Sequence, residues 1–173
     1  RMSGEDSLEA SLRAAAPDLL GYFERRVIPR QDAADLLGEL MVQAWRNASS
    51  APAEAEQRRM RLYGVARNVL ANHTRSMRRR SALVDRIRGY LAAAGDSPDE
   101  AEGSAIRDLV ARLPETQREL LVLVHWDGLT ITQAAQVLEL NASTARSRYA
   151  AAREALRSAI NEVEAPSWSG NHG

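Results

Sequence analysis

The chain has 173 residues, enough for one medium domain or two small ones, and 45% of them are hydrophobic, so it can bury a core. It contains no cysteine, which excludes disulfides, thiolate catalysis and cysteine-bound zinc. Its 23 basic residues are all arginine and balance 23 acidic ones, so the net charge is zero. The charges are segregated, however, because Asp85 is the only acid among the many arginines of residues 58–88, whereas residues 96–108 are mostly acidic. A zero mean therefore excludes no polyanionic partner, since the local field decides binding.

Residue usage predicts an all-helical protein. Aromatic residues make up only 5% of the chain, and the abundant alanine and leucine favour helices over strands. No apolar run approaches the roughly 20 residues that a membrane-spanning helix needs, so no membrane insertion is expected. The start of the chain is acidic and has no apolar signal core. We therefore expect a cytoplasmic location.

Leucines at helical spacing predict two helices before residue 50. The first is expected to restart at Pro17 and to end before Pro29. Asp32 is placed to cap the second helix, which is strongly amphipathic. Its two sides carry different side chains, the polar Asp35, Glu39 and Gln43 on one and the apolar Leu36, Leu37, Leu40, Met41, Ala44 and Trp45 on the other.

A third helix is predicted from about residue 58 to residue 80. His73 lies on its apolar stripe, where a histidine satisfied within the core is expected rather than a catalyst. The opposite stripe bears guanidinium and amide donors: Arg61, Gly64, Asn68, Asn72, Arg75 and Arg79. A plain solvated helix face usually alternates charges of both signs. This stripe therefore favours contact with nucleic acid over a merely solvated basic face.

A polar stretch at residues 95–104 has the composition of a linker, and a second helical half follows it. A helix there ends near Gly128, which suits a left-handed C′ position. Thr130 and Gln133 then match a capping box that opens a short helix. The turn Glu139-Leu140-Asn141 leads to a last helix of about residues 142–161. Short helix, tight turn and long helix together are typical of a helix-turn-helix.

The outer face of the last helix indicates DNA binding. It carries Ser143, Arg146, Ser147, Ala150, Arg153 and Arg157. Arginine can read guanine edges in the major groove, serine can bond phosphates, and small residues allow a close approach. An exposed helical hairpin without a DNA partner is the alternative interpretation of this face.

Two sets of motifs resemble a known family. Residues 113–123, 127–130 and 146–148 resemble region 4 of the extracytoplasmic-function (ECF) sigma factors, which belong to the sigma-70 family. Residues 32–46 resemble region 2.2, and residues 62–68 with the arginines after them resemble regions 2.3 and 2.4. The sets occur in the family's order. The family usually has glycine in the turn where this chain has Glu139, and often tryptophan at the position of Arg61.

The resemblance implies an all-α fold of two small helical domains, a region 2 bundle and a region 4 helix-turn-helix, joined by a short flexible linker. The implied division is residues 7–82 for region 2, 83–104 for the linker, 105–162 for region 4 and 163–173 for a disordered tail. It also implies a sigma factor that binds core RNA polymerase and directs promoter-specific transcription initiation. No catalytic residue, cofactor or metal is expected.

The family's functional residues carry over by motif. Region 2.2 docks on the clamp helices of the polymerase β′ subunit, here through Asp32, Asp35, Leu36, Glu39 and Gln43. Region 2 opens the −10 element and captures a flipped base, here with the loop at residues 49–57 and with Arg61, Tyr63, Asn68, Asn72 and Arg75. Region 4 reads the −35 element, here through Ser143, Thr144, Arg146, Ser147, Arg148 and Arg153. The implied partners are promoter DNA, core polymerase through its β′ clamp helices and β flap, and an anti-sigma factor.

Other protein classes fit only parts of the sequence. A response-regulator-type transcriptional activator would carry a similar helix-turn-helix, but the first half shows neither the strands nor the early acidic site of a receiver. An enzyme is not expected, because His73, His125 and His172 are far apart and no Gly-rich phosphate loop occurs. A purely helical adaptor would leave the arginine and asparagine stripe unexplained.

Overall fold

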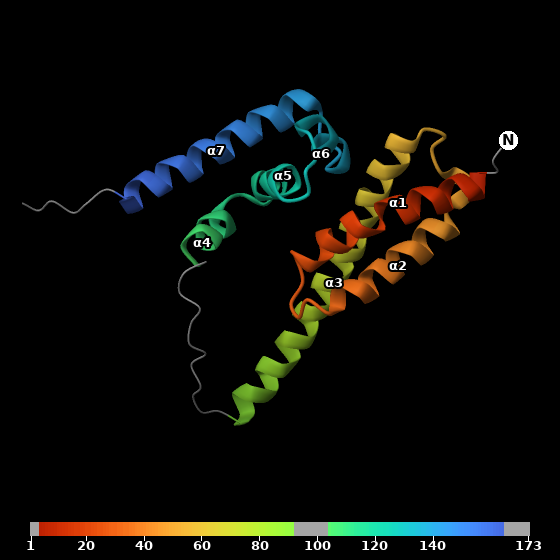
Figure 1. The fold of residues 1–173 in the computed structure, drawn as a ribbon. Coiled ribbons are helices and arrows are strands. Elements are labelled where there is room, and N and C mark those ends of the chain that lie inside the picture. Colours follow the sequence, from red (N-terminus) through yellow and green to blue (C-terminus); the bar gives the residue numbers. More distant parts are fainter. Residues whose placement is uncertain (1–3, 92–103, 165–173) are drawn as a thin grey trace, which may run out of the picture. The chain divides into compact units, whose positions relative to one another are not determined.

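A computed structural model describes residues 4–91 and 104–164, which form helices joined by short loops and contain no strand (Figure 1). The all-helical class predicted from the sequence is confirmed. The chain divides into two compact units, residues 1–96 and residues 97–173. Across the described residues no helix is long and apolar enough to cross a membrane. Residues 163 and 164 of the expected tail are helical, whereas the rest of the tail, including Trp168, and residues 92–103 of the expected linker lie outside the described residues.

The first unit is a bundle of three helices with a short 3₁₀ helix. The elements are α1 (Gly4–Glu24), α2 (Asp32–Arg46), η1 (Ala48–Ser50) and α3 (Ala55–Leu91). Each of the three long helices packs on the other two, so their apolar stripes close one core. The largest side chains that are fully buried in this core are Leu19, Phe23, Leu40, Tyr63 and Val69.

Helix α1 continues through Pro17 without a break, so the expected restart at this residue is wrong. Proline removes one backbone hydrogen bond, but here it lies on the exposed side of the helix. Leu12 and Leu19, on either side of it along the chain, are buried against the rest of the unit and hold both segments in place. Asp32 likewise is the first residue of α2 rather than its cap, a position that Gln31 occupies without a side-chain hydrogen bond.

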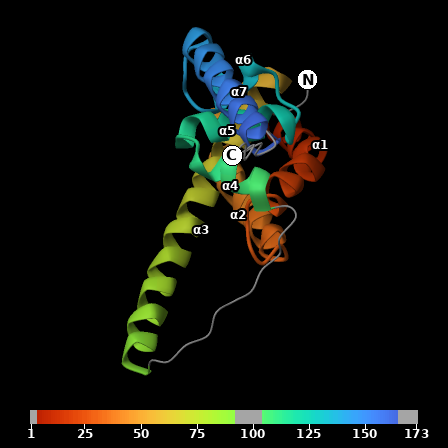
Figure 2. The ribbon, with the colours of Figure 1, turned by 90° about the vertical axis from the view of Figure 1, so that its left-hand side faces the viewer.

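Helix α3 ends at Leu91, so residues 83–91 of the expected linker are helical instead. This segment contains no proline to interrupt the helix, and its leucines and arginines are good helix formers, although Gly89 is a poor one. In two views at right angles, the C-terminal part of α3 extends past α1 and α2 (Figures 1 and 2). The first unit thus presents a long helix that is only partly covered by its neighbours.

The second unit contains α4 (Ser104–Arg112), α5 (Glu115–His125), α6 (Ile131–Val137) and α7 (Ala142–Glu164). Helix α7 packs on α5 and α6 and touches α4. The predicted capping box is confirmed: the Gln133 N–H donates to Thr130 Oγ1 at 3.1 Å, and the Thr130 N–H donates to Gln133 Oε1 at 3.0 Å. Gly128 has φ of 70°, as its predicted left-handed position requires.

The turn between α6 and α7 contains a strained residue. Glu139 has φ of 56°, the only positive φ at a non-glycine position in the described residues, and its side chain is exposed. A Cβ atom in this left-handed region crowds the following carbonyl oxygen and costs about 1 kcal/mol or more. The chain accepts this cost because the Leu140 N–H reaches the Ala135 carbonyl at 2.8 Å and closes the turn.

Replacing Glu139 by glycine should therefore stabilise the second unit. We expect a gain of about 0.5–1 kcal/mol, the relief of strain less the added entropy of the unfolded chain. Amide hydrogen exchange of α6 and α7 measures the second unit by itself. Gln136→Gly is the matched control, because the same change within a helix should lower protection; a loss of protection in both variants would contradict the argument.

Candidate nucleic-acid interface

The first turns of α7 form an exposed face bearing arginine and hydroxyl groups. Asn141 caps the helix, as predicted, because its Oδ1 accepts a hydrogen bond from the Thr144 N–H at 2.7 Å. Thr144 itself is half-buried. The other residues predicted in these turns to read DNA are exposed together: Ser143, Arg146, Ser147 and Arg148. This face has the side chains and the free space that entry into a major groove requires.

Small residues set the position of α7 in its unit. Ala145 and Ala152 of α7 and Ala134 of α6 are fully buried, which lets the helices approach closely. A hydrogen bond of 2.9 Å joins Tyr149 Oη of α7 to His125 Nε2 of α5, and the two rings are stacked with centroids 5.9 Å apart. These contacts fix the rotation of α7 about its own axis and so determine which residues it exposes.

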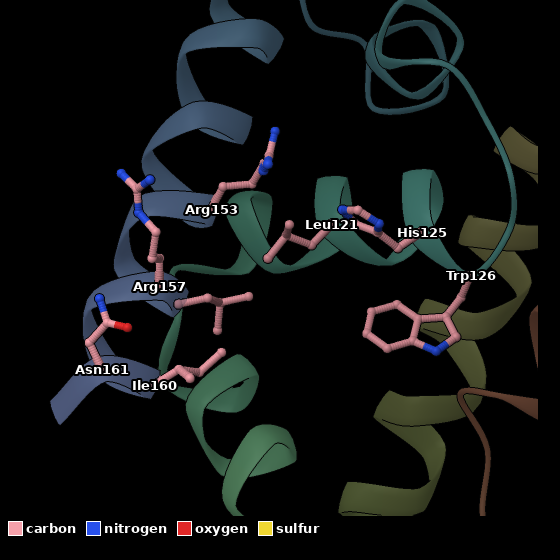
Figure 3. A pocket seen from close by; sticks show the side chains of 8 residues that line it. Leu121, His125, Trp126, Arg153, Arg157, Ile160 and Asn161 are labelled. Atoms are coloured by element: carbon pink, nitrogen blue, oxygen red, sulfur yellow. The ribbon is translucent and has the colours of Figure 1, made fainter. Parts of the chain in front are cut away.

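Arg153 lies further along α7, beside a groove between α5 and α7 (Figure 3). The groove has a volume of about 300 Å³. Its lining combines apolar and basic side chains: Leu121, His125, Trp126, Arg153, Leu156, Arg157, Ile160 and Asn161. The guanidinium carbon of Arg153 is 5.9 Å from the centroid of the Tyr149 ring, within cation–π range. Arg153 thus borders a surface of different chemistry from the arginine and serine face of the first turns.

The exposed side of α3 carries amide and guanidinium groups, as predicted from the sequence. Asn68, Asn72 and Arg75 are exposed at a spacing that places them on one face. Arg75 Nη2 donates to Asn72 Oδ1 at 2.6 Å, which orients both side chains. Arg78, Arg79 and Arg80 are exposed further along. The sequence has no acidic residue from 57 to 84, so this face attracts polyanions.

Two residues expected at the −10 element lie apart from this face. Tyr63 is fully buried, with its ring centroid 5.8 Å from that of Tyr22 in an edge-to-face contact. Tyr63 is therefore a core residue, and its ring is not exposed for stacking on an unpaired base. The large tyrosine ring fills the centre of a bundle that has few other aromatic residues. Arg61 is directed toward the loop after α2, where it donates to the Ser50 carbonyl and to Ser50 Oγ.

An acidic face lies on α2. Asp35 and Glu39 are exposed, Asp32 and Gln43 are half-buried, and Gln43 Nε2 donates to Glu39 Oε1 at 3.2 Å. Within the described part of the chain, none of these three carboxylates pairs with an arginine. Leu36 is only 5% exposed, so its expected contact with a partner is corrected to a core contact. The apolar stripe of α2 must face α1 and α3, and Leu36 belongs to that stripe.

An apolar groove lies between α1 and α2 that the sequence analysis did not predict. It has a volume of about 730 Å³, and Leu12, Ala16, Met41, Val42 and Trp45 supply its apolar lining. Trp45 was assigned to the buried side of α2, yet 48% of it is exposed. The signal was available, because Val42 and Trp45 are three residues apart and lie beside the line of Leu36, Leu40 and Ala44. An apolar stripe wider than one core contact indicates a second apolar surface.

Comparisons with known proteins agree with this architecture. The sequence model described as "Sigma-70, region 4" matches residues 104–156. The ECF RNA polymerase sigma factor SigL of Mycobacterium tuberculosis is 28% identical over 176 residues, covering 94% of this chain and 97% of that protein. SigK of Mycobacterium bovis BCG, also an ECF sigma factor, is 32% identical over 134 residues, covering 71% and 67%. The structure of RpoE with NepR from Bartonella quintana has a TM-score of 0.55 at 21% identity, covering 89% of this chain and 94% of that one, and supports the fold.

A capped helix-turn-helix in one unit and an arginine-rich helical bundle in the other are typical of a DNA-binding transcription subunit. The chain belongs to the ECF family of RNA polymerase sigma factors. It therefore binds core RNA polymerase and directs promoter-specific transcription initiation. The response-regulator alternative is not favoured, because the relatives match along nearly the whole chain and the first unit consists of helices where it is described. Sigma factors as a family are not enzymes.

Removing the N-terminal cap of α7 should loosen the first turn of this helix. Asn141→Ala deletes the acceptor of the Thr144 N–H and should cost about 1 kcal/mol, because that amide then faces solvent without a fixed partner. Amide exchange of the first turn of α7 should accelerate about fivefold. Ser158→Ala, an exposed change in the same helix, should leave these amides unchanged. Equal protection in Asn141→Ala and the unaltered chain would refute the role of the cap.

Proposed function

We propose that the second unit, as region 4 over residues 105–162, reads the −35 element with the first turns of α7. The capped, exposed start of α7 is the observation that carries this proposal. Arg146 supplies paired donors to a guanine edge, while Ser143, Thr144, Ser147 and Arg148 hold the backbone. Arg153 is seven residues beyond Arg146, so we assign it to the flanking phosphates or to the groove that it lines.

Arg146 should carry base specificity. Arg146→Ala should cost about 1–3 kcal/mol in promoter binding and should relax discrimination at one position of the −35 element. In vitro transcription with core polymerase, on a cognate promoter and on its single-base −35 variants, measures both effects. Arg112→Ala removes an exposed arginine of α4 and controls for the loss of charge. Unchanged discrimination in Arg146→Ala would show that another residue reads the base.

We further propose that the first unit, as region 2 over residues 7–82, opens the −10 element. Asn68, Asn72 and Arg75 form a face of donors on α3, further along the helix than the loop that precedes it, and the arginines that follow provide phosphate contacts. An unpaired base needs hydrogen bonds to its edges and a surface to stack on, and a planar guanidinium supplies both. We assign Arg61 to the loop rather than to DNA, because its donors are engaged with Ser50.

The acidic face of α2 is proposed as the site for the clamp helices of the polymerase β′ subunit. Its unpaired carboxylates suit a basic partner surface, and the core contact of Leu36 keeps the helix rigid beneath them. The groove between α5 and α7 is the corresponding candidate for the β flap, since it is apolar with a basic rim.

Charge reversal on α2 should separate polymerase binding from DNA binding. Glu39→Arg should weaken association with core polymerase by at least about tenfold, because it places like charges in the interface. Gel filtration or fluorescence anisotropy with labelled sigma factor measures this affinity. Glu115→Arg makes the same change at the exposed start of α5, away from the residues that line either groove, and should bind normally. If Glu39→Arg binds core polymerase as the unaltered chain does, the docking face lies elsewhere.

Regulation by a sequestering protein is also proposed. The Bartonella quintana RpoE structure is a complex with the anti-sigma factor NepR, and this chain shares its fold. The apolar grooves of the two units are candidate sites for such a partner. We propose a cytoplasmic location and no catalytic activity of the chain itself; no group of His, Asp or Glu side chains in the described residues could hold a metal.

A further inference from the structure

The loop between α2 and α3, residues 47–54, is held by hydrogen bonds from within. Asn47 Nδ2 donates to the Gln43 carbonyl at 2.9 Å, and Ser50 Oγ donates to the Asn47 carbonyl at 3.0 Å. The Ala51 N–H donates to the Ala48 carbonyl at 3.0 Å. These bonds shape the start of the loop, but its second half, residues 51–54, receives its fixed partners from α3.

Arg58 fastens the second half of the loop. Its Nη1 donates to the Pro52 carbonyl at 3.0 Å and to the Ala53 carbonyl, and its Nε donates to Ser11 Oγ of α1 at 2.8 Å. Ser11 Oγ in turn donates to the Ser7 carbonyl at 2.9 Å. One half-buried guanidinium therefore connects the loop to α1, through a serine that is 47 residues from Arg58 in the sequence.

Arg61, one turn further along α3, fastens the first half of the loop. Its Nη1 donates to the Ser50 carbonyl and its Nη2 donates to Ser50 Oγ at 2.7 Å. The acceptors that the structure gives to Arg58 and Arg61 are carbonyl and hydroxyl oxygens, so their positive charge is not neutralised by these contacts. The two side chains thus hold the loop and leave its surroundings attractive to a phosphate backbone.

The space under the loop is too small for a ligand. Leu8, Gln43, Asn47, Arg58 and Arg61 help to line a cavity of about 40 Å³, enough for a few water molecules but not for a nucleobase. Arg58 and Arg61 therefore shape the loop and do not line a base pocket beneath it. Guanidinium is suited to this role, since its planar fork donates in several fixed directions at once, which an ammonium on a flexible stem does not.

We propose that Arg58, together with Arg61, is a positioning residue that fixes the loop of residues 47–54 before promoter DNA arrives and so sets discrimination among −10 sequences. The inference rests on the proposed function of α3 and its preceding loop. A loop held in one conformation loses less conformational entropy on binding than a flexible one, and it rejects a base that would need another conformation. When the hydrogen bonds from Arg58 to the loop are lost, the loop adapts to more bases and the sigma factor becomes less selective.

The test compares the full chain with Arg58→Lys, which keeps the charge and loses the fork. With core polymerase, transcription is measured from a promoter mapped for this chain and from each single-base −10 variant. Arg58→Lys should reduce the ratio of cognate to substituted transcription by about tenfold, as expected for losing hydrogen bonds from a charged donor. Discrimination at the −35 element should not change, which separates loop positioning from a general loss of folding.

Matched variants distinguish the positioning of the loop by Arg58 from other causes of a loss of −10 discrimination. Arg59→Lys alters the neighbouring arginine, which pairs with Asp18 of α1 at 3.5 Å and not with the loop, and should retain −10 discrimination. Ser11→Ala removes one acceptor of Arg58 and should give a smaller loss, and the double variant should be no less selective than Arg58→Lys alone, since both changes break the same bond.

Each outcome bears on one statement. If Arg58→Lys kept full −10 discrimination, or if Arg59→Lys lost as much of it, Arg58 would not be a positioning residue for the loop. Additive losses in the double variant would also overturn this role. If the unaltered chain itself shows no preference among −10 bases while still selecting the −35 element, the proposed function of the first unit fails instead, and the two failures are thereby distinguishable.

Discussion

The absence of acidic residues from α3 between positions 57 and 84 is the constraint on which the first unit depends. From Arg61 to Arg80 its arginines have no carboxylate three or four residues away along the helix, so they must find other partners or face solvent. Near the start of the helix, the guanidinium groups bond the carbonyl and hydroxyl oxygens of the preceding loop. Further along they stay exposed in a row. One compositional bias thus produces both an ordered loop and a surface for a polyanion.

Features governed by local chemistry could be predicted from the sequence. Thr130 with Gln133, Asn141 before α7 and Gly128 after α5 each satisfy backbone groups within a few residues, and each adopts the predicted conformation. The arginine and asparagine stripe of α3 was also predicted, because a helix of known period fixes which side chains share a face. The fold class followed from the same periodicity.

Features that depend on packing between helices could not be predicted in this way. A proline ordinarily interrupts a helix, but α1 continues through Pro17 because buried leucines on both sides secure it. The family motifs placed Tyr63 and Leu36 on binding surfaces, but both side chains are buried in the core of the first unit. Trp45 was assigned to the core and remains half-exposed, because the sequence does not tell how much of an apolar stripe its neighbours cover.

The half-exposed indoles have a practical consequence. Trp45 borders the groove of the first unit and Trp126 borders that of the second, and each is the one tryptophan within the described residues of its unit. Indole emission shifts to the blue when water is displaced from the ring. With Trp168 and one of the two groove tryptophans, Trp45 or Trp126, replaced by phenylalanine, the remaining indole can follow occupancy of one groove at a time, so the chain contains its own optical probes for the arrival of a partner.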